Sequence, residues 1–159
     1  MTKGSAIRNH ALRNFDDFRD AIFAFRLPRI LLTAIELDLF TAMGGRSWTV
    51  PVLAKRLRVS RRGLDILCRN LAGAGFLRKQ GAQYRNGKLA GTALNAKHKA
   101  FRGAYLDLLR SQWDDWSRLT DSIRHGRPVE HEAPDDPAYR RRFSWAMHQR
   151  SLEVAPQVA

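Results

Sequence analysis

Few side chains in this sequence of 159 residues are spaced for catalysis or metal binding. The five histidines do not follow the spacing of zinc ligands, and a single cysteine, Cys68, excludes both a thiolate cluster and an internal disulfide. Asp114 and Asp115 are adjacent, but consecutive residues of a helix point about 100° apart and do not share a proton. We therefore predict no metal site and no catalytic residue, and a buried apolar environment for Cys68.

The basic residues are the second set of side chains that could have a function, because the formal net charge of the chain is +13. Residues 45–90 hold eleven arginines and lysines but one acid, Asp65, and so carry ten of the thirteen net charges. Arg61, Arg62 and Arg69 would lie on one outer helix face, where a recognition helix contacts DNA. A dimeric DNA-binding regulator is therefore one hypothesis. Solvated arginines, or arginines that pair with a partner's acids, are the alternative.

Apolar residues recur at helical spacing over most of the chain, which predicts a mainly α fold. An amphipathic helix is expected over residues 16–25. A second helix is expected over residues 28–43, because Pro28 suits the first turn of a helix and Gly44 with Gly45 would end it.

A helix–turn–helix is expected next. Thr49 would cap a short helix over residues 50–57, and Ser60 would cap a second helix that ends at Gly75. Two strand-like segments separated by a glycine then predict a β-hairpin, and a helix–turn–helix with such a hairpin is the winged-helix arrangement. The hairpin strands would cover residues 76–79 and 83–86.

Helical spacing returns towards the C-terminus. One long helix is expected over residues 101–123, ended by Gly126 and Pro128, and a last helix over residues 139–154. The predicted fold is a winged helix with a small hairpin, flanked by an N-terminal dimerisation helix and long C-terminal helices. No apolar run approaches the length of a membrane span and the start lacks the apolar stretch of a secretory signal, so we expect a soluble, cytoplasmic protein.

The N-terminal helix carries an apolar face with no expected core near it. Its aromatic and aliphatic residues recur at three- and four-residue steps with charges between them. Such a face needs a second subunit to cover it, so we predict a homodimer. The residues expected at the dimer interface are Phe15, Phe18, Ile22, Phe23 and Phe25.

The segment 27–40, LPRILLTAIELDLF, resembles the entry helix of dimeric S-adenosylmethionine-dependent O-methyltransferases of the caffeic-acid, hydroxyindole and bacterial polyketide-tailoring types. Residues 116–119, Trp-Ser-Arg-Leu, are similar to the family's motif before its substrate lid. Phe143 and Met147, one helical turn apart, match its Phe-x-x-x-Met helix. The resemblance spans roughly residues 18–156 and implies a homodimeric methyltransferase acting on a small aromatic or polyketide hydroxyl.

The resemblance divides the chain into two parts. Residues 1–95 would be the dimerisation arm with the winged helix, and residues 96–159 a helical lid segment that leads to a Rossmann-like methyltransferase domain. The glycine-rich cofactor loop and the catalytic histidine of that domain do not occur in this sequence, which has no glycine after Gly126. We expect S-adenosylmethionine in the full-length protein, but not stably bound to this chain alone. Truncation of the sequence at its source is the simplest explanation for the absence of this loop and this histidine.

The resemblance also assigns residues to a site. Leu106, Trp113, Phe143 and Met147 would line the acceptor pocket, for which ordinary core packing is the alternative. Two further residues would lie near the cofactor, where an arginine can pair with its carboxylate; solvent exposure is the alternative for both. These residues are Arg150 and Ser151.

Three hypotheses follow from the sequence. The chain is the dimerisation and substrate-lid part of an O-methyltransferase, or a dimeric winged-helix DNA-binding regulator, or a cofactor-free module that binds an effector or acts as a scaffold. The methyltransferase-like motifs outside the helix–turn–helix favour the first hypothesis.

Overall fold

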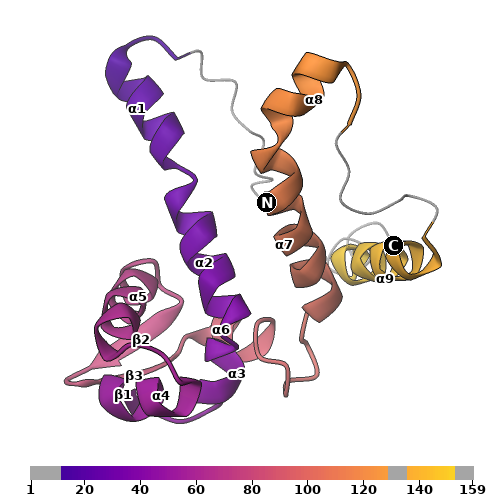
Figure 1. The fold of residues 1–159 in the computed structure, drawn as a ribbon. Helices are drawn as coiled ribbons and strands as arrows, with labels where there is room; N and C mark the ends of the chain where they lie inside the picture. The colour runs from indigo at the N-terminus through magenta and orange to yellow at the C-terminus, as the bar shows by residue number, and fades with distance from the viewer. Residues whose placement is uncertain (1–11, 129–135, 153–159) are drawn as a thin grey trace, which may run out of the picture.

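The computed structural model describes residues 12–128 and 136–152, and it is mainly helical, as predicted (Figure 1). Its elements fall into an N-terminal group, which holds a small sheet, and a C-terminal group. The N-terminal group consists of α1 (Phe15–Phe23), α2 (Arg26–Glu36), α3 (Leu39–Met43), β1 (Trp48–Thr49), α4 (Val50–Leu57), α5 (Arg61–Gly73), β2 (Leu77–Gln80), β3 (Gln83–Asn86) and α6 (Lys88–Thr92). The C-terminal group consists of α7 (Gly103–Ser117), α8 (Leu119–His125) and α9 (Pro137–Ser151).

The first two helices form one bent rod (Figure 1). Pro28 has no N–H to donate to the carbonyl of Ala24. The helix is interrupted at Ala24 and Phe25, between α1 and α2. The expectation of a single helix over residues 28–43 is wrong, because Asp38 adopts the left-handed conformation, with a φ of 51°, and separates α2 from α3. Aspartate is one of the few residues that tolerate this conformation. The break directs α3 into the core, where Phe40 is 1% exposed.

The helix–turn–helix forms over α4 and α5, close to the predicted bounds. Ser60 caps α5, because its Oγ accepts a hydrogen bond from the backbone N of Gly63 at 3.3 Å. Thr49 was predicted to cap α4, but its side chain makes no capping bond and its backbone pairs with Gln83 in the sheet. The predicted hairpin is present as β2 and β3, and β1 completes an antiparallel sheet of order β1-β3-β2. The sequence patterns did not predict β1 or α6.

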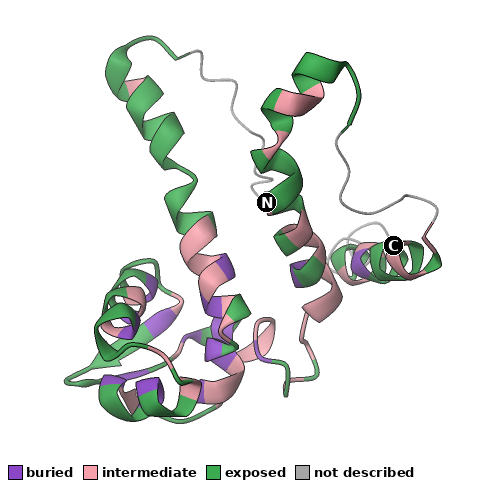
Figure 2. Ribbon diagram, viewed as in Figure 1, coloured by how far each residue is buried: buried purple, intermediate pink, exposed green. Residues whose placement is uncertain are grey.

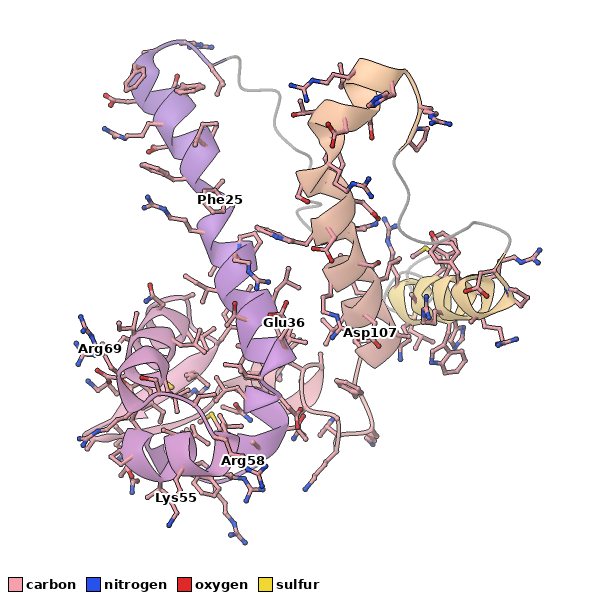
Figure 3. The ribbon with its side chains drawn as sticks, in the orientation of Figure 1. Phe25, Glu36, Lys55, Arg58, Arg69 and Asp107 are labelled. Atoms are coloured by element: carbon pink, nitrogen blue, oxygen red, sulfur yellow. The ribbon has the colours of Figure 1, made fainter. Side chains whose placement is uncertain are left out.

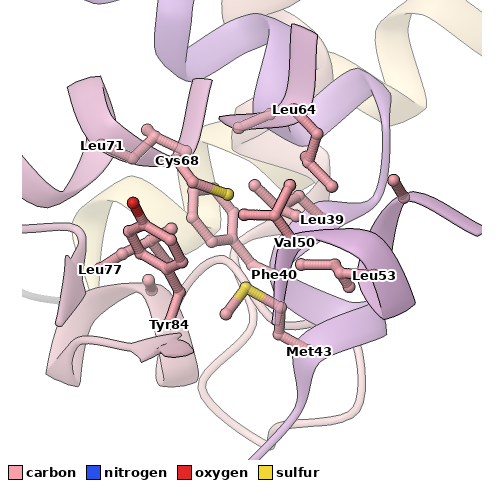
Figure 4. Packing of buried hydrophobic residues seen from close by; sticks show 13 residues of the cluster. Leu39, Phe40, Met43, Val50, Leu53, Leu64, Cys68, Leu71, Leu77 and Tyr84 are labelled. Carbon is pink, nitrogen blue, oxygen red and sulfur yellow. The ribbon is translucent and has the colours of Figure 1, made fainter. Parts of the chain in front are cut away.

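The core of the N-terminal group lies between the helices and the sheet (Figure 4). Cys68 is 0% exposed within it, as predicted. Asn86 ties the sheet to α3, because its Nδ2 donates to the carbonyl oxygens of Phe40 and Gly44 at 2.8 and 3.0 Å. The buried cluster comprises Ala34, Leu39, Phe40, Met43, Val50, Leu53, Ala54, Leu64, Cys68, Leu71, Leu77, Tyr84 and Ala90.

The C-terminal helices depart from the prediction at one residue. The expected single helix over residues 101–123 is wrong, because Arg118 leaves the helical conformation, with φ of −99° and ψ of 11°, and α8 starts after it. Gly126 ends α8 in the left-handed conformation, as predicted. Among the helices of the described ranges, none combines the length and the apolar character needed to cross a membrane.

Helix α9 packs against α7. Asp136 caps it by accepting a hydrogen bond from the backbone N of Ala138 at 2.9 Å. Gln149 then links the two helices, because its Oε1 accepts from the backbone N of Tyr105 and its Nε2 donates to the carbonyl of Phe101. Val154, at the predicted end of this helix, lies outside the described residues.

Candidate functional site

A cavity of about 660 Å³ opens between α2, α7 and α9, where the two groups of elements meet. Glu36 on α2 and Asp107 on α7 lie on facing helices at this junction (Figure 3). We call it the α2–α7–α9 cavity. Its lining residues are Arg29, Glu36, Asp107, Leu108, Arg110, Ser111, Trp113, Asp114, Tyr139, Arg142 and Phe143.

Ion pairs occupy one side of this cavity. Arg29 Nη1 and Nη2 donate to Glu36 Oε1 and Oε2 at 2.8 and 3.1 Å, and these bonds raise the pKa of Arg29. The same guanidinium lies 5.6 Å from the centre of the Trp113 ring, which connects α2 to α7. Arg110 pairs with Asp107 at 3.5 Å. Sequence reasoning missed Arg29 and Glu36, and their seven-residue spacing on one helix face was the available signal.

Aromatic side chains occupy the other side. Trp113 comes from α7, and Tyr139 and Phe143 come from successive turns of α9, with their ring centres 6.1 Å apart and their planes 25° apart. A flat ring can stack on such surfaces while its polar groups reach the ion pairs. Tyr139 was missed from the sequence, although it lies one helical turn before Phe143.

Two of the four residues predicted for the acceptor pocket come together in this cavity. Trp113 and Phe143, thirty residues apart in sequence, both line it, and Phe143 is 42% exposed. Leu106 is instead buried at 8% exposure, and Met147 is half-buried; neither lines the cavity. The geometry therefore gathers half of the predicted set at one site.

The two residues predicted near a cofactor lie at the end of α9. Arg150 and Ser151 are exposed and do not line the α2–α7–α9 cavity. Ser151 Oγ donates to the carbonyl of His148 at 2.8 Å, which is a local helix-end contact. Within residues 12–128 and 136–152, no three His, Cys, Asp or Glu side chains gather where a metal ion could bind.

Helix α1 is almost entirely exposed (Figure 2). Phe15, Phe18 and Ile22 follow one face of it, and the rings of Phe15 and Phe18 lie 5.7 Å apart. Phe23 lies on another face, where the guanidinium of Arg26 covers its ring at 3.7 Å. All five residues predicted for the dimer interface are at least 41% exposed, so much of their apolar surface faces solvent in the single chain.

The basic residues of segment 45–90 lie on the surface. Arg69 lies on the side of the N-terminal group away from α7 and α9, and Lys55 and Arg58 lie at its lower end (Figure 3). Arg69 forms an ion pair with Asp65. An exposed basic face fits DNA binding and simple solvation equally well. Geometry alone does not separate the two hypotheses, and similarity to known proteins is the stronger criterion.

Comparison with protein families shows what the N-terminal group is similar to. Residues 20–96 match the family model of the O-methyltransferase dimerisation domain. The matched segment is therefore similar to that domain. The matched segment begins within α1 and includes every later element of the N-terminal group, helix–turn–helix and hairpin included. The match favours the methyltransferase hypothesis over the DNA-binding regulator.

Individual proteins similar to the chain agree with this assignment. The tetracenomycin polyketide synthesis 8-O-methyl transferase of Streptomyces glaucescens is 31% identical over 117 residues, which cover 72% of this chain and 34% of that protein. An O-methyltransferase family protein from Burkholderia thailandensis has a similar structure, with 26% identity, a TM-score of 0.79, and coverage of 93% of this chain and 46% of that one.

A second similar structure is human N-acetylserotonin methyltransferase in complex with S-adenosylmethionine. It has 20% identity to this chain, a TM-score of 0.70, and coverage of 90% of this chain and 47% of that one. The dimerisation domain and the helices after it thus share the fold of such enzymes. The chain spans about a third of the curated relative and less than half of each solved structure.

Proposed function

We propose that this chain pairs two subunits and covers the acceptor site of an S-adenosylmethionine-dependent O-methyltransferase. The observation that carries the proposal is the match of residues 20–96 to the dimerisation domain, because that segment starts within the exposed apolar helix α1. In this proposal residues 1–95 form the arm and a winged helix that serves dimerisation, and residues 96–159 form the lid segment. The homodimer would act in the cytoplasm.

The proposed acceptor is a small aromatic or polyketide hydroxyl. Methyl transfer to oxygen requires that the hydroxyl is aligned with the methyl donor and that water is excluded. Trp113 and Phe143 would orient a flat acceptor in the α2–α7–α9 cavity, and Leu106 and Met147 would support them from the neighbouring α7–α9 packing. The polyketide named for the Streptomyces relative and the N-acetylserotonin named for the human one support this class of acceptor.

The cofactor of the proposed enzyme is S-adenosylmethionine, which supplies the methyl group when bound. The residues of this chain do not fit that cofactor by themselves. The sequence has no glycine after Gly126 from which to build a glycine-rich loop around the amino-acid end of the cofactor. Arg150 and Ser151, exposed at the end of α9, would lie at the edge of a site that other residues build.

Dimerisation is tested by placing a charge on the apolar face of α1. Ile22→Asp introduces a carboxylate at a residue that is 53% exposed in the single chain and covered in the proposed dimer. Light scattering during size exclusion should then show a monomer. Ile123→Asp on α8, at 76% exposure, is the matched control and should leave the dimer intact. Equal behaviour of the two variants would contradict the proposal.

The acceptor cavity is tested by fluorescence. Titration with 2-naphthol, a flat aromatic hydroxyl, should quench tryptophan emission to saturation in the unmodified chain. Trp113→Phe should abolish the saturable part, whereas Trp116→Phe, which alters a ring that is 69% exposed, should retain it. Saturable quenching that survives Trp113→Phe, or none in the unmodified chain, would refute this assignment of the cavity.

A further inference from the structure

A second hollow, of about 600 Å³, lies between α2 and α5. Its walls are mainly apolar, and Ile66 in the middle of α5 is 54% exposed beside it. We call it the α2–α5 groove. The lining residues are Phe25, Arg26, Arg29, Ile30, Thr33, Leu37, Val59, Ser60, Gly63, Leu64, Ile66, Leu67 and Asn70.

Helix α1 and Phe25 after it carry an apolar stripe, and α1 is short enough to lie along the apolar groove. Phe15, Phe18, Ile22 and Phe25 recur at steps of three, four and three residues, so they share one helix face, and each is at least 47% exposed. Helix α1 has nine residues and is about 13 Å long. The α2 wall of the groove, from Phe25 to Leu37, runs for about 18 Å.

Helix α1 has little tertiary packing within the described chain. Its N-terminus is capped, because Asn14 Oδ1 accepts a hydrogen bond from the backbone N of Asp17 at 2.9 Å. None of its nine residues is buried, however, and most helical stability in proteins comes from tertiary packing of an apolar face. The capped but uncovered helix is therefore suited to insertion into an apolar groove.

The arm of the same chain is directed away from the groove. Ala24 and Phe25 keep helical backbone angles, and Arg29 N donates to the carbonyl of Phe25 at 3.1 Å, so α1 continues close to the line of α2. In Figure 1 it extends beyond α5 rather than back over it. Insertion into its own groove would require this junction to be refolded.

We infer that the α2–α5 groove of each chain holds helix α1 of a second copy. The arrangement is reciprocal, as a twofold interface requires, and Phe25 connects the arm of each chain to its own groove. Charge supports the pairing. Helix α1 carries three carboxylates and one guanidinium, whereas α5 carries three guanidiniums and one carboxylate. The inference rests on the proposed dimerisation and specifies which surfaces meet.

The experiment is disulfide cross-linking between two different single variants of the full chain. One carries Phe18→Cys and the other Ile66→Cys; they are mixed, allowed to exchange subunits and oxidised with a copper catalyst. Linked peptides are then identified by mass spectrometry. A second mixture, Ile22→Cys with Ile66→Cys, covers a neighbouring register. Cys68 remains in all chains, since it is 0% exposed.

The matched control is Phe23→Cys with Ile66→Cys, because Phe23 lies on another face of the same helix. We expect at least about tenfold more mixed product from Phe18→Cys or Ile22→Cys than from this control, because disulfides form only between closely approaching Cα atoms. Sedimentation of the same samples before oxidation gives the oligomeric state independently.

The possible outcomes test the groove pairing and the dimerisation separately. A dimer without mixed product overturns the groove pairing alone, and so does exclusive linkage between two Phe18→Cys chains, which would mean that the arms pair with each other. A double variant that carries both Phe18→Cys and Ile66→Cys is oxidised separately. Linkage within one chain of this variant would place the arm in its own groove and would also overturn the groove pairing. A monomer in sedimentation overturns both the groove pairing and the proposed dimerisation.

Discussion

The buried thiol of Cys68 makes the stability of the protein depend on pH. Burial raises the pKa of its thiol from 9.0 to about 11. Above pH 9 the unfolded thiol loses its proton while the folded one keeps it, so the unfolded state binds fewer protons and stability falls as the pH rises. Below pH 9 both states are protonated and this residue contributes no pH dependence.

We predict that this effect removes roughly 2 to 3 kcal/mol of stability between pH 9 and about pH 11. Urea unfolding below and at the top of this range measures it, with Cys68→Ala as the control. The variant is less stable at every pH because of the cavity that the substitution leaves. Its free energy of unfolding should, however, fall less as the pH rises than that of the unmodified chain. Parallel losses in the two proteins would show that the thiol does not titrate in this way.

Gly87 is constrained by the backbone around it. A Cβ at this position would lie 2.9 Å from the carbonyl oxygens of Gly75 and Phe76, which belong to the backbone and cannot move aside cheaply. We predict that Gly87→Ala lowers the free energy of unfolding by about 1 to 3 kcal/mol. Gly73→Ala, at the open end of α5, should instead be neutral or stabilise by up to about 1 kcal/mol. Thermal unfolding that ranks the two variants in the opposite order would contradict this account.

At the scale of elements, the cap of α5 can be tested against the uncapped start of α4. Ser60→Ala removes the acceptor for Gly63 N and should cost about 1 kcal/mol of stability. Thr49→Ala, which removes no capping bond, should cost less. Urea unfolding of both variants measures the difference, and equal losses would mean that the Ser60 hydrogen bond contributes little.

Helix and strand positions could be predicted from the sequence where local signals act alone. Ser60 and Gly126 mark helix ends that capping chemistry determines, and both were found. The breaks at Asp38 and Arg118 were missed, because the apolar spacing continues across both residues and neither is a glycine or proline. The two-residue strand β1 was missed because its pairing with β3, 34 residues away in sequence, defines it.

The candidate site could be predicted only in part, because segments that are far apart in the sequence form it. Trp113 and Phe143 were predicted from a family resemblance, and the packing of α9 on α7 brings them to one cavity. Arg29 comes to that cavity from α2, more than 80 residues earlier in the chain, and no periodicity links it to Trp113. Local patterns predict helix faces, whereas the partner of each face depends on the whole fold.

At the scale of the whole molecule, the account depends on the apolar surface of α1 being covered by a second copy of the chain. Sedimentation equilibrium of the unmodified protein over a range of concentrations tests this most directly. We predict a mass of twice the 18.2 kDa of one chain, with dissociation on dilution. A mass of 18.2 kDa at every concentration would contradict the account, because α1 would then remain uncovered.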